Sequence, residues 1–287
     1  MEQNRPSTLD LSHDLLGPSY SNKDINFHYW YTHPAPMRDY ELHCHPTYEI
    51  YYFLSGNACY LVEGNYYRPT PNSLLMIPAG VFHGVRIESE GEYGRFALHF
   101  SENILPPENR HILLSPFHKE DDTPDIYYEN VQEFRLFQYF EALIDSAKMP
   151  SEHRDMSLSI AIQSILSQIL YMSPFTKGVN PRENMTEQLS LLLHYLNQNL
   201  TEHHSLDELA ARFYISKHYM NKLFRKATGT TIGEYLTIKR INAAQNLMAQ
   251  GQSAAQAGIS AGFNDYSTFY RAYRRITGHC PRDDKEI

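Results

Sequence analysis

Apolar and polar residues alternate with a period of two through the first third of the chain. The alternation occurs in five short runs bounded by Gly, Pro or Asn, at residues 26–31, 48–54, 58–62, 73–77 and 95–100. A period of two is typical of strands that bury one face. Gly56-Asn57 and Glu63-Gly64-Asn65 separate neighbouring runs and favour hairpin turns, because Gly and Asn tolerate positive φ. The pattern predicts an antiparallel sandwich or barrel over residues 25–125.

The period becomes helical in residues 126–174. Apolar side chains recur every three or four positions over 131–144 and again over 158–169, and Pro174 closes the second run. Two amphipathic helices at this place would cover the barrel or form the seam of a dimer. The pattern alone favours neither arrangement.

Three segments lack a clear period. Residues 1–24 are polar and predict a loose N-terminal arm. Residues 101–125 contain several prolines and the acidic run Glu120-Asp121-Asp122, and they predict a surface connection. Residues 175–184 contain Gly and Pro but few apolar positions, which is typical of an interdomain linker. A second domain is therefore predicted over residues 185–287.

The second domain contains one helical pattern twice. Seven positions recur 49 residues later with residues of a similar kind: Met220, Lys222, Phe224, Arg225, Lys226, Thr228 and Gly229 match Phe269, Arg271, Tyr273, Arg274, Arg275, Thr277 and Gly278. Upstream, Ser205-x-x-Glu208 and Ser253-x-x-Gln256 predict capping boxes that open a shorter helix. The repeat predicts two helix-turn-helix units, at about 205–228 and 253–277, joined by a helix over 233–249.

The longer helix of each unit has one basic face. In the second copy the apolar and basic residues fall on opposite sides, with Phe269, Tyr273 and Ile276 facing a core and Arg271, Arg274 and Arg275 facing outward, after Asn264 or Asp265 as the N-cap. A basic face after a tight turn suits a helix that enters a DNA groove. An ordinary solvated cationic helix is the alternative, and the repetition of the basic positions disfavours it.

Charge separates the two parts of the chain. The whole chain has a formal net charge of −8, from 25 Lys and Arg and 33 Asp and Glu. Residues 189–287 contain 12 basic and 8 acidic residues, a net charge of +4, whereas residues 1–188 contain 13 and 25, a net charge of −12. Phosphate contacts depend on the field within about 10 Å at 0.1 M salt, so the positive part is the predicted DNA-binding part.

Three histidines and a glutamate form a second group of chemically informative residues. His43 and His45 share one face of a strand, Glu49 follows after a short turn, and His83 lies beyond Pro78-Ala79-Gly80. Three imidazoles and one carboxylate suit a divalent transition metal such as Mn, Fe, Ni or Zn. The alternative is a polar pocket without metal, in which His43 and Glu49 hydrogen-bond a small polar ligand.

Other side chains of this region have plainer explanations. Cys44 alternates with the two histidines, so we expect its side chain to point away from their cavity. His99 lies near the end of the last predicted strand and fits a satisfied core histidine. The many tyrosines suit a sugar or aromatic ligand, but strand propensity and core packing explain most of them.

These motifs resemble two known families. About the last hundred residues resemble the DNA-binding domain of AraC/XylS-type regulators, on Gly262, Phe263, Asp265, Ser267, Phe269, Arg271, Tyr273, Arg274, Arg275, Gly278 and Pro281. Ala257-Gly258 stands where that family favours Ile-Ala, and glycine in a helix costs about 1 kcal/mol, so we expect a looser second unit. His43-x-His45-x3-Glu49-x6-Gly56 and Pro78-x-Gly80-x2-His83 resemble the two cupin motifs.

The resemblance implies an α+β protein of two domains, with a cupin-like antiparallel β-barrel, flanking helices and an all-α double helix-turn-helix domain. It implies a sequence-specific DNA-binding transcriptional regulator, with activation favoured, that responds to a small molecule such as a sugar in the barrel. His43, His45, Glu49 and His83 are the implied ligand-binding residues and the implied ligands of a divalent transition metal. The implied partners are double-stranded DNA, the effector, a second copy of the chain and RNA polymerase.

Residues near the start of each longer helix are expected to contact bases, and later basic residues are expected to contact phosphates. The candidates for DNA contact are Ser216, Lys217, His218, Tyr219, Asn221, Lys222, Arg225, Lys226, Asp265, Tyr266, Ser267, Thr268, Arg271, Arg274 and Arg275.

Two other functions are consistent with the same residues. One is a metal-dependent cupin oxygenase or isomerase fused to a DNA-binding module, but no additional general acid or base stands out, and we expect no enzyme. The other is a barrel that serves only as a dimerisation scaffold. No apolar run reaches the 18 or so residues of a membrane span, and the N-terminus lacks a signal-peptide pattern. With three cysteines in no zinc-finger spacing, a reducing cytoplasm is expected.

Overall fold

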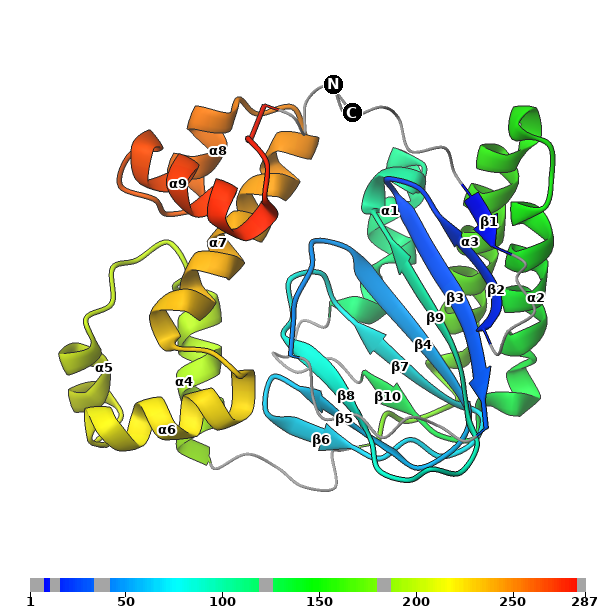
Figure 1. Cartoon of the computed structure of the whole chain (residues 1–287), viewed down its shortest axis with the longest axis horizontal. Helices are drawn as coiled ribbons and strands as arrows, with labels where there is room; N and C mark the ends of the chain where they lie inside the picture. The colour runs from blue at the N-terminus through cyan, green and yellow to red at the C-terminus, as the bar shows by residue number, and fades with distance from the viewer. Residues whose placement is uncertain (1–7, 11–15, 34–41, 119–125, 180–186, 283–287) are drawn as a thin grey trace.

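Two antiparallel sheets form the N-terminal half of the computed structural model, which describes residues 8–10, 16–33, 42–118, 126–179 and 187–282 (Figure 1). Among these residues the larger sheet has the order β1-β2-β3-β9-β4-β7-β10 and the smaller the order β6-β5-β8. The strands are β1 Thr8–Asp10, β2 Leu16–Ser21, β3 Ile25–Thr32, β4 Tyr48–Ser55, β5 Ala58–Val62, β6 Asn65–Tyr67, β7 Ser73–Ile77, β8 His83–Ile87, β9 Tyr93–Phe100 and β10 Tyr127–Tyr128. The predicted antiparallel strands are confirmed, and so is the hairpin turn at Glu63-Gly64, which joins β5 and β6. The prediction of a hairpin at Gly56-Asn57 was wrong, because β4 and β5 lie in different sheets and do not pair.

The larger sheet buries both of its faces. Tyr51 and Phe53 of β4 belong to a core between the two sheets, whereas Ile50 and Tyr52 belong to a core shared with the helices. Successive side chains of a strand point to opposite faces, which explains why six consecutive residues of β4 are buried. The polar residues of the inner face therefore lie between two layers of strands.

Helices cover the outer face of the larger sheet (Figure 1). They are η1 Glu102–Ile104, α1 Pro107–Leu113, η2 Ser115–Phe117, η3 Val131–Phe134, α2 Leu136–Ala147 and α3 Ser151–Met172. Phe140 of α2 and Ile162 and Ile165 of α3 are fully buried in the same core as Ile50. The apolar stripes predicted from the sequence thus cover the sheet.

Three expectations for the N-terminal half were wrong. Residues 8–10 and 16–21 form strands that extend the larger sheet, so this part of residues 1–24 is not a loose arm. Residues 101–125 contain a helix, α1, beside two 3-10 turns, and their acidic run at 120–122 lies outside the described residues. The helix predicted over 131–144 is interrupted at Arg135, whose φ of 53° is left-handed and cannot continue a right-handed helix.

Two helix-turn-helix units joined by one long helix form the C-terminal half, as predicted (Figure 1). The helices are α4 Glu187–Gln198, α5 Leu206–Arg212, α6 Lys217–Thr228, α7 Ile232–Ala249, α8 Ala254–Ser260 and α9 Tyr266–Thr277. Both predicted capping boxes are present, and Asp265 is the N-cap of α9. Gly229 and Gly278 end α6 and α9 with left-handed backbone, the usual role of glycine after a helix. Within the described residues, no helix combines the length and the apolar character needed to cross a lipid bilayer.

Candidate ligand-binding site and DNA-binding surface

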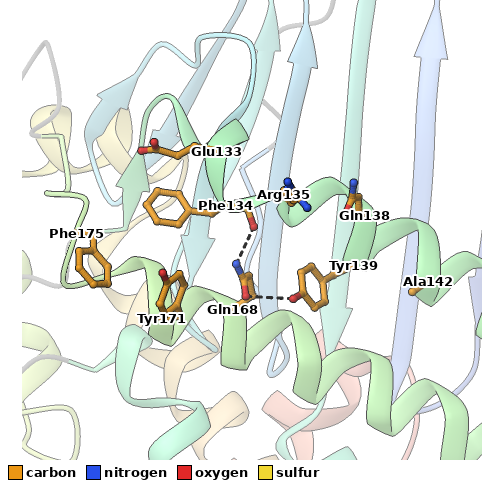
Figure 2. Close-up of a pocket in the computed structure, with 9 residues that line it drawn as sticks. All are labelled: Glu133, Phe134, Arg135, Gln138, Tyr139, Ala142, Gln168, Tyr171 and Phe175. Carbon is orange, nitrogen blue, oxygen red and sulfur yellow. Dashed lines mark hydrogen bonds between the residues drawn. The ribbon is translucent and has the colours of Figure 1, made fainter.

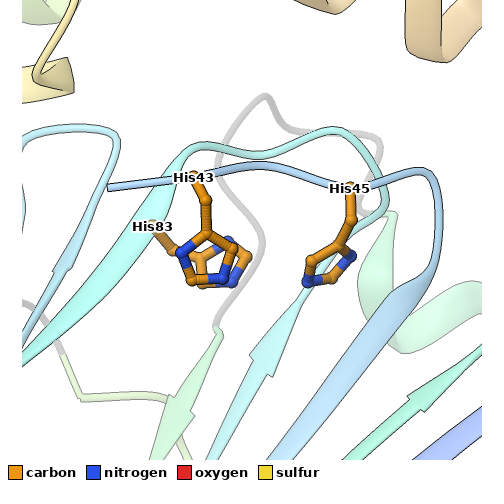
Figure 3. Close-up of side chains that lie close together, drawn as sticks. All are labelled: His43, His45 and His83. Carbon is orange, nitrogen blue, oxygen red and sulfur yellow. The ribbon is translucent and has the colours of Figure 1, made fainter. Parts of the chain in front are cut away.

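A short extended segment brings two predicted site histidines beside the smaller sheet. The backbone of His43 pairs with that of His83 at the start of β8, through two N–H···O bonds of 2.9 Å. Figure 3 shows the rings of His43, His45 and His83 on the same side of these segments, close to the strands of the two-sheet domain (the barrel). The ring centroids of His43 and His83 lie 4.4 Å apart, and those of His45 and His83 lie 5.0 Å apart.

Glu49 lies at the centre of the histidines. It is 5% exposed, at the start of β4, and its carboxylate oxygens lie 2.9 Å from His83 Nε2, 3.4 Å from His99 Nε2 and 3.6 Å from His45 Nε2. Glu49 and the imidazoles around it therefore form one compact group, and His43 joins it through His45 and His83. One potential ligand atom from each of His43, His45 and His83 lies within 4.8 Å of the others, and the same holds for His45, Glu49 and His99.

Backbone carbonyls orient two of the imidazoles. His45 Nδ1 lies 2.9 Å from the carbonyl oxygen of Thr47, and His83 Nδ1 lies 2.8 Å from that of Val81. A carbonyl only accepts, so each Nδ1 carries a proton and donates it, which leaves the Nε2 of each ring facing Glu49. This arrangement is the usual support of a metal-binding histidine.

The donor set fits a divalent transition metal. Glu49 Oε2 and His83 Nε2 are buried and close together, yet neither makes a hydrogen bond of acceptable geometry. Buried polar atoms are normally satisfied, so two convergent orphans indicate a missing partner. Imidazole nitrogens with a carboxylate oxygen suit Mn, Fe, Ni or Zn. His43, His45, Glu49 and His83 are the residues that would hold such an ion, with His99 as a fifth donor.

The charges of the cluster favour ligand binding at neutral pH. Burial alone would raise the pKa of Glu49, but His99 and His83 outweigh it and hold that pKa well below its usual range. Burial lowers the pKa of His99 to about 4, so this imidazole is neutral near pH 7. His83 is opposite: burial acts to lower its pKa, but Glu49 raises it above the usual value. A carboxylate and at least one neutral imidazole are therefore available.

His99 belongs to the cluster, contrary to the expectation of a core histidine. The pairing of β4 with β9 places Glu49 opposite His99, and His99 Nδ1 lies 3.2 Å from His45 Nε2. Its position inside an apolar strand resembles that of any core histidine, and only the strand register shows its partner. A cavity of about 210 Å³ opens beside His45 and His99, next to Asn26 and the turn before β3.

The segment that carries His43 and His45 also contacts the C-terminal half. Cys44 points away from the histidines, as predicted, and its sulfur accepts a hydrogen bond of 3.0 Å from Asn242 of α7. Phe82, next to His83, stacks on Tyr235 of α7 with ring centroids 4.8 Å apart. Neighbouring residues of two segments thus face the cluster on one side and α7 on the other.

Glu63 is a second link between the halves. Its carboxylate, in the turn between β5 and β6, accepts hydrogen bonds from Tyr235 Oη at 2.8 Å and Asn197 Nδ2 at 3.2 Å. Lys239 Nζ lies 2.6 Å from the same carboxylate, and the two side chains are 12% and 19% exposed. Three donors from α4 and α7 therefore converge on one acceptor of the barrel.

The predicted DNA-contacting side chains form two exposed rows. On α6 and its N-cap, Ser216, Lys217, His218, Tyr219, Lys222, Arg225 and Lys226 are exposed and Asn221 is half-buried. On α9 and its N-cap, Asp265, Tyr266, Ser267, Thr268, Arg271, Arg274 and Arg275 are exposed. The opposite faces, with Phe224, Phe269 and Tyr273, are fully buried, so both helices present their basic side to solvent.

Some of these side chains already have partners. Ser216 and Asp265 accept hydrogen bonds from Tyr219 N and Thr268 N as N-caps. Arg275 donates two hydrogen bonds to Glu234 at the start of α7, at 2.6 and 3.0 Å. Lys217 Nζ lies 2.7 Å from Asp207 of α5. The structure brings the predicted residues together on two surfaces, and it gives some of them a local structural role as well.

A groove of about 680 Å³ lies on the outer side of α2 and α3 (Figure 2). Gln168 crosses it, donating to the Phe134 carbonyl oxygen at 2.7 Å and accepting from Tyr139 Oη at 3.2 Å. At its end lie Tyr171, on α3, and Phe175, just after α3, which are 59% and 71% exposed. Met156 and Ile160 are also exposed on α3. This face of α3 is separate from the stripe that covers the sheet.

An antiparallel two-sheet domain with a polar cluster, joined to two helix-turn-helix units, defines a ligand-binding and DNA-binding regulator. The chain matches the family model of the AraC-like ligand-binding domain over residues 29–196 and that of a helix-turn-helix domain over residues 209–286. It therefore belongs to the AraC family of transcriptional regulators.

Named relatives are distant. The HTH-type transcriptional activator RhaS of Escherichia coli O1:K1 / APEC is 22% identical over 264 residues, which cover 88% of this chain and 89% of RhaS. Among solved structures, ToxT from Vibrio cholerae O395 is 12% identical, with 91% and 97% coverage and a TM-score of 0.36. An AraC-type regulator from Chromobacterium violaceum is 27% identical over 34% of this chain and 89% of its own, with a TM-score of 0.32.

Proposed function

We propose that this regulator is an activator that binds a small molecule in its barrel, at His43, His45, Glu49, His83 and His99. The observation that carries the proposal is the alternation of residues 43–45. The side chains of His43 and His45 belong to the cluster, and Cys44 between them accepts a hydrogen bond from Asn242 of α7. By this route, a movement of the cluster side chains on ligand binding would be passed to α7, the helix that joins the two DNA-binding units.

The route depends on differential contacts in two states. A ligand shifts a conformational equilibrium only when it binds one state more tightly than the other. A ligand that displaces His43 also moves Cys44, and one that displaces His83 also moves Phe82, because the two residues of each pair are adjacent in the chain. Cys44 contacts Asn242 and Phe82 contacts Tyr235, so ligand binding in the barrel changes how α7 packs against it.

A divalent transition metal is part of the proposed ligand site. The orphaned Glu49 Oε2 and His83 Nε2 and the two carbonyl-oriented imidazoles support it. Such an ion would supply a Lewis-acidic centre for hydroxyl or carboxylate oxygens of an effector. The protein's own side chains would position those oxygens and exclude water from them.

We further propose that α6 and α9 enter successive major grooves. Residues near their N-termini, such as His218, Asn221, Ser267 and Arg271, would contact base edges. The later basic residues would contact phosphates: Lys222, Arg225, Lys226, Arg274 and Arg275. The exposure of both basic rows supports this arrangement. Joined by α7, the two helices would be separated by about one turn of DNA, roughly 34 Å.

A second copy of the chain is the proposed partner for the outer face of α3. Met156, Ile160 and Tyr171 are large apolar side chains exposed on one helix, beside the groove of Figure 2. Ile160→Glu is expected to shift the sedimentation coefficient from dimer to monomer, while Glu141→Gln on α2 leaves it unchanged. RNA polymerase as partner and a cytoplasmic location follow from activation as the proposed role.

Metal content tests the ligand site. Protein purified without a metal-binding tag is expected to contain about one transition-metal ion per chain, measured by mass spectrometry. His45→Ala and Glu49→Ala should lose it, and His153→Ala, which removes an exposed histidine of α3, should keep it. Metal-free wild type would show that the cluster binds its effector as a polar pocket.

DNA affinity tests the regulator. A duplex selected from a random library should bind wild type with an affinity that changes on removal of the metal by a chelator. Phe82→Ala should weaken that response, because it removes the stacking contact between a neighbour of the cluster and Tyr235 of α7. Equal responses in wild type and Phe82→Ala would contradict the route, and no selected duplex at all would contradict the function.

A further inference from the structure

A half-buried arginine lies on the inner face of the barrel, beyond the histidine cluster. Arg95 is on β9, paired with Trp30 of β3 on one side and Phe53 of β4 on the other. Its Nε is buried without a hydrogen-bond partner. Within the part of the chain that the structure describes, its guanidinium makes no hydrogen bond or ion pair. Burying a polar group without a hydrogen-bond partner is costly, so the unpaired Nε indicates a missing acceptor.

Aromatic rings hold the guanidinium in place. Its central carbon lies 5.2 Å from the ring centroid of Trp30 and 5.0 Å from that of Tyr51. Tyr51 and Tyr93 are hydrogen-bonded to each other through their hydroxyls, and Tyr93 packs edge-on against Trp30. Contacts to ring faces fix the orientation of an arginine but leave its N–H donors unsatisfied. The donors therefore remain available to an acceptor.

Among the residues that the structure describes, no acidic side chain forms an ion pair with Arg95. Glu49 is the acid whose charge acts on Arg95, and its oxygens already face His45, His83 and His99. Burial acts to lower the pKa of Arg95, but Tyr51, Tyr93 and Glu49 outweigh it and raise that pKa, so the group stays charged. A guanidinium in this state is complementary to an anion that enters the barrel.

We infer that Arg95 is the anion-binding part of the effector site, and that the effector is a compact organic carboxylate. The inference rests on the proposed function and specifies its ligand. A guanidinium can form two parallel hydrogen bonds with a carboxylate or with a phosphate, but its single positive charge balances the single negative charge of a carboxylate and only part of the charge of a phosphate. Trp30 and Tyr51 offer faces to the body of such a molecule.

The strand register places the two polar parts of the site within one ligand's reach. Arg95, Ala97 and His99 alternate along the inner face of β9, which puts Arg95 and His99 four residues, or roughly 13 Å of backbone, apart. Long side chains shorten that gap from both ends. The small Ala97 between them faces Tyr51 and His28 of the neighbouring strands. An acid with hydroxyls at its far end would contact both parts.

Trp30 provides the measurement, because it is the only tryptophan of the chain and lies against Arg95. Its fluorescence would be titrated with matched acids and neutral analogues: D-glucuronate with D-glucose, D-galacturonate with D-galactose, and benzoate with benzyl alcohol. Glucose 6-phosphate, acetate and inorganic phosphate would separate carboxylate from phosphate recognition. At least one acid should give a saturable change and bind at least tenfold more tightly than its neutral analogue.

Variants assign the effect to Arg95. Arg95→Met should weaken binding of that acid at least tenfold, and Arg95→Lys should weaken it less. Arg86→Met, which removes an arginine paired with Glu88 on β8, should leave the affinity unchanged. Without ligand, Arg95→Met should unfold at the same temperature as wild type or higher, since it removes an uncompensated charge. A purely structural arginine would lower the unfolding temperature.

Three results would overturn the inference: a neutral analogue that binds as tightly as its acid, an acid affinity that Arg95→Met changes less than twofold, or no saturable response to any organic carboxylate. A response to glucose 6-phosphate alone would replace the carboxylate by a phosphate and also overturn it. DNA binding measured on the same samples separates these failures from failure of the proposed function.

Discussion

The two helix-turn-helix units share one plan but have different surroundings. Each has a capping box before its first helix and a left-handed glycine after its second. The core of the first unit includes Phe82 of the barrel and packs against Cys44, whereas the core of the second consists of residues from α7, α8, α9 and the turns between them. The first unit thus shares its core with the ligand-binding domain, whereas the second unit has a core of its own.

The turns of the two units both contain a residue with positive φ, but the residue differs. Position 214 of the first unit corresponds to position 262 of the second, and both have positive φ, 54° at Tyr214 and 97° at Gly262. Tyr214 is 95% exposed and free of close packing. A Cβ on Gly262 would lie 2.6 Å from Thr201 Cα, so only glycine fits there.

The first helices also differ in a matched way. Gly258 of α8 corresponds to Ala210 of α5, and Phe269 of α9 corresponds to Met220 of α6. A Cβ on Gly258 would lie 2.6 Å from the Phe269 ring. The second unit thus combines a small residue with a large ring. The expectation that Gly258 loosens this unit overlooked its partner: the glycine allows α8 to approach α9 closely.

Gly262→Ala is expected to have the largest effect. The clash with the Thr201 backbone and the positive φ together should cost about 3 kcal/mol of unfolding free energy. Tyr214→Gly should change stability in the other direction, by up to about 1 kcal/mol, because glycine relieves the left-handed strain but loses more entropy on folding. Urea unfolding followed by circular dichroism measures both. Equal effects would show that the turns are equivalent.

Gly258→Ala should cost about 1–2 kcal/mol, because overpacking against the buried Phe269 outweighs the better helix propensity of alanine. The double variant Gly258→Ala with Phe269→Met reproduces the pair found in the first unit and should recover part of the loss. Ala210→Gly is the matched control and should cost about 1 kcal/mol through entropy alone. If the double variant is no more stable than the single one, the two residues are not coupled.

Glu63→Ala tests the coupling of the first unit to the barrel. It leaves Tyr235, Asn197 and Lys239 without their shared acceptor, at a cost of about 2 kcal/mol. Circular dichroism, dominated by helices, should show a lower urea midpoint, while Trp30 fluorescence, which reports on the barrel, should change little. Glu90→Ala, at an exposed position, is the control. Unchanged midpoints by both probes would mean that Glu63 does not couple the halves.

Local signals made the C-terminal half predictable, and longer-range contacts did not. Capping boxes and glycine stops involve residues three or four apart, so the sequence shows them directly. The pairing of Glu49 with His99 joins strands 50 residues apart, and the acceptor role of Glu63 depends on helices more than 130 residues away. The strands β6 and β10 were missed because two or three residues carry too little alternation. The role of Arg95 could not be predicted either, because its contacts with Trp30 and Tyr51 join three different strands.

The smallest expected effect separates two basic residues at equivalent positions. Lys226 of α6 corresponds to Arg275 of α9, and both are exposed. Arg275 is bound by both carboxylate oxygens of Glu234, so much of its charge is already compensated. Lys226→Ala should lower the slope of log affinity against log salt concentration by about 0.9, the value for one phosphate contact, and Arg275→Ala should lower it less. Lys148→Ala, on the barrel side, should leave the slope unchanged. Equal slopes for the two variants would mean that Glu234 releases Arg275 when DNA binds, and that the second unit uses its full basic row.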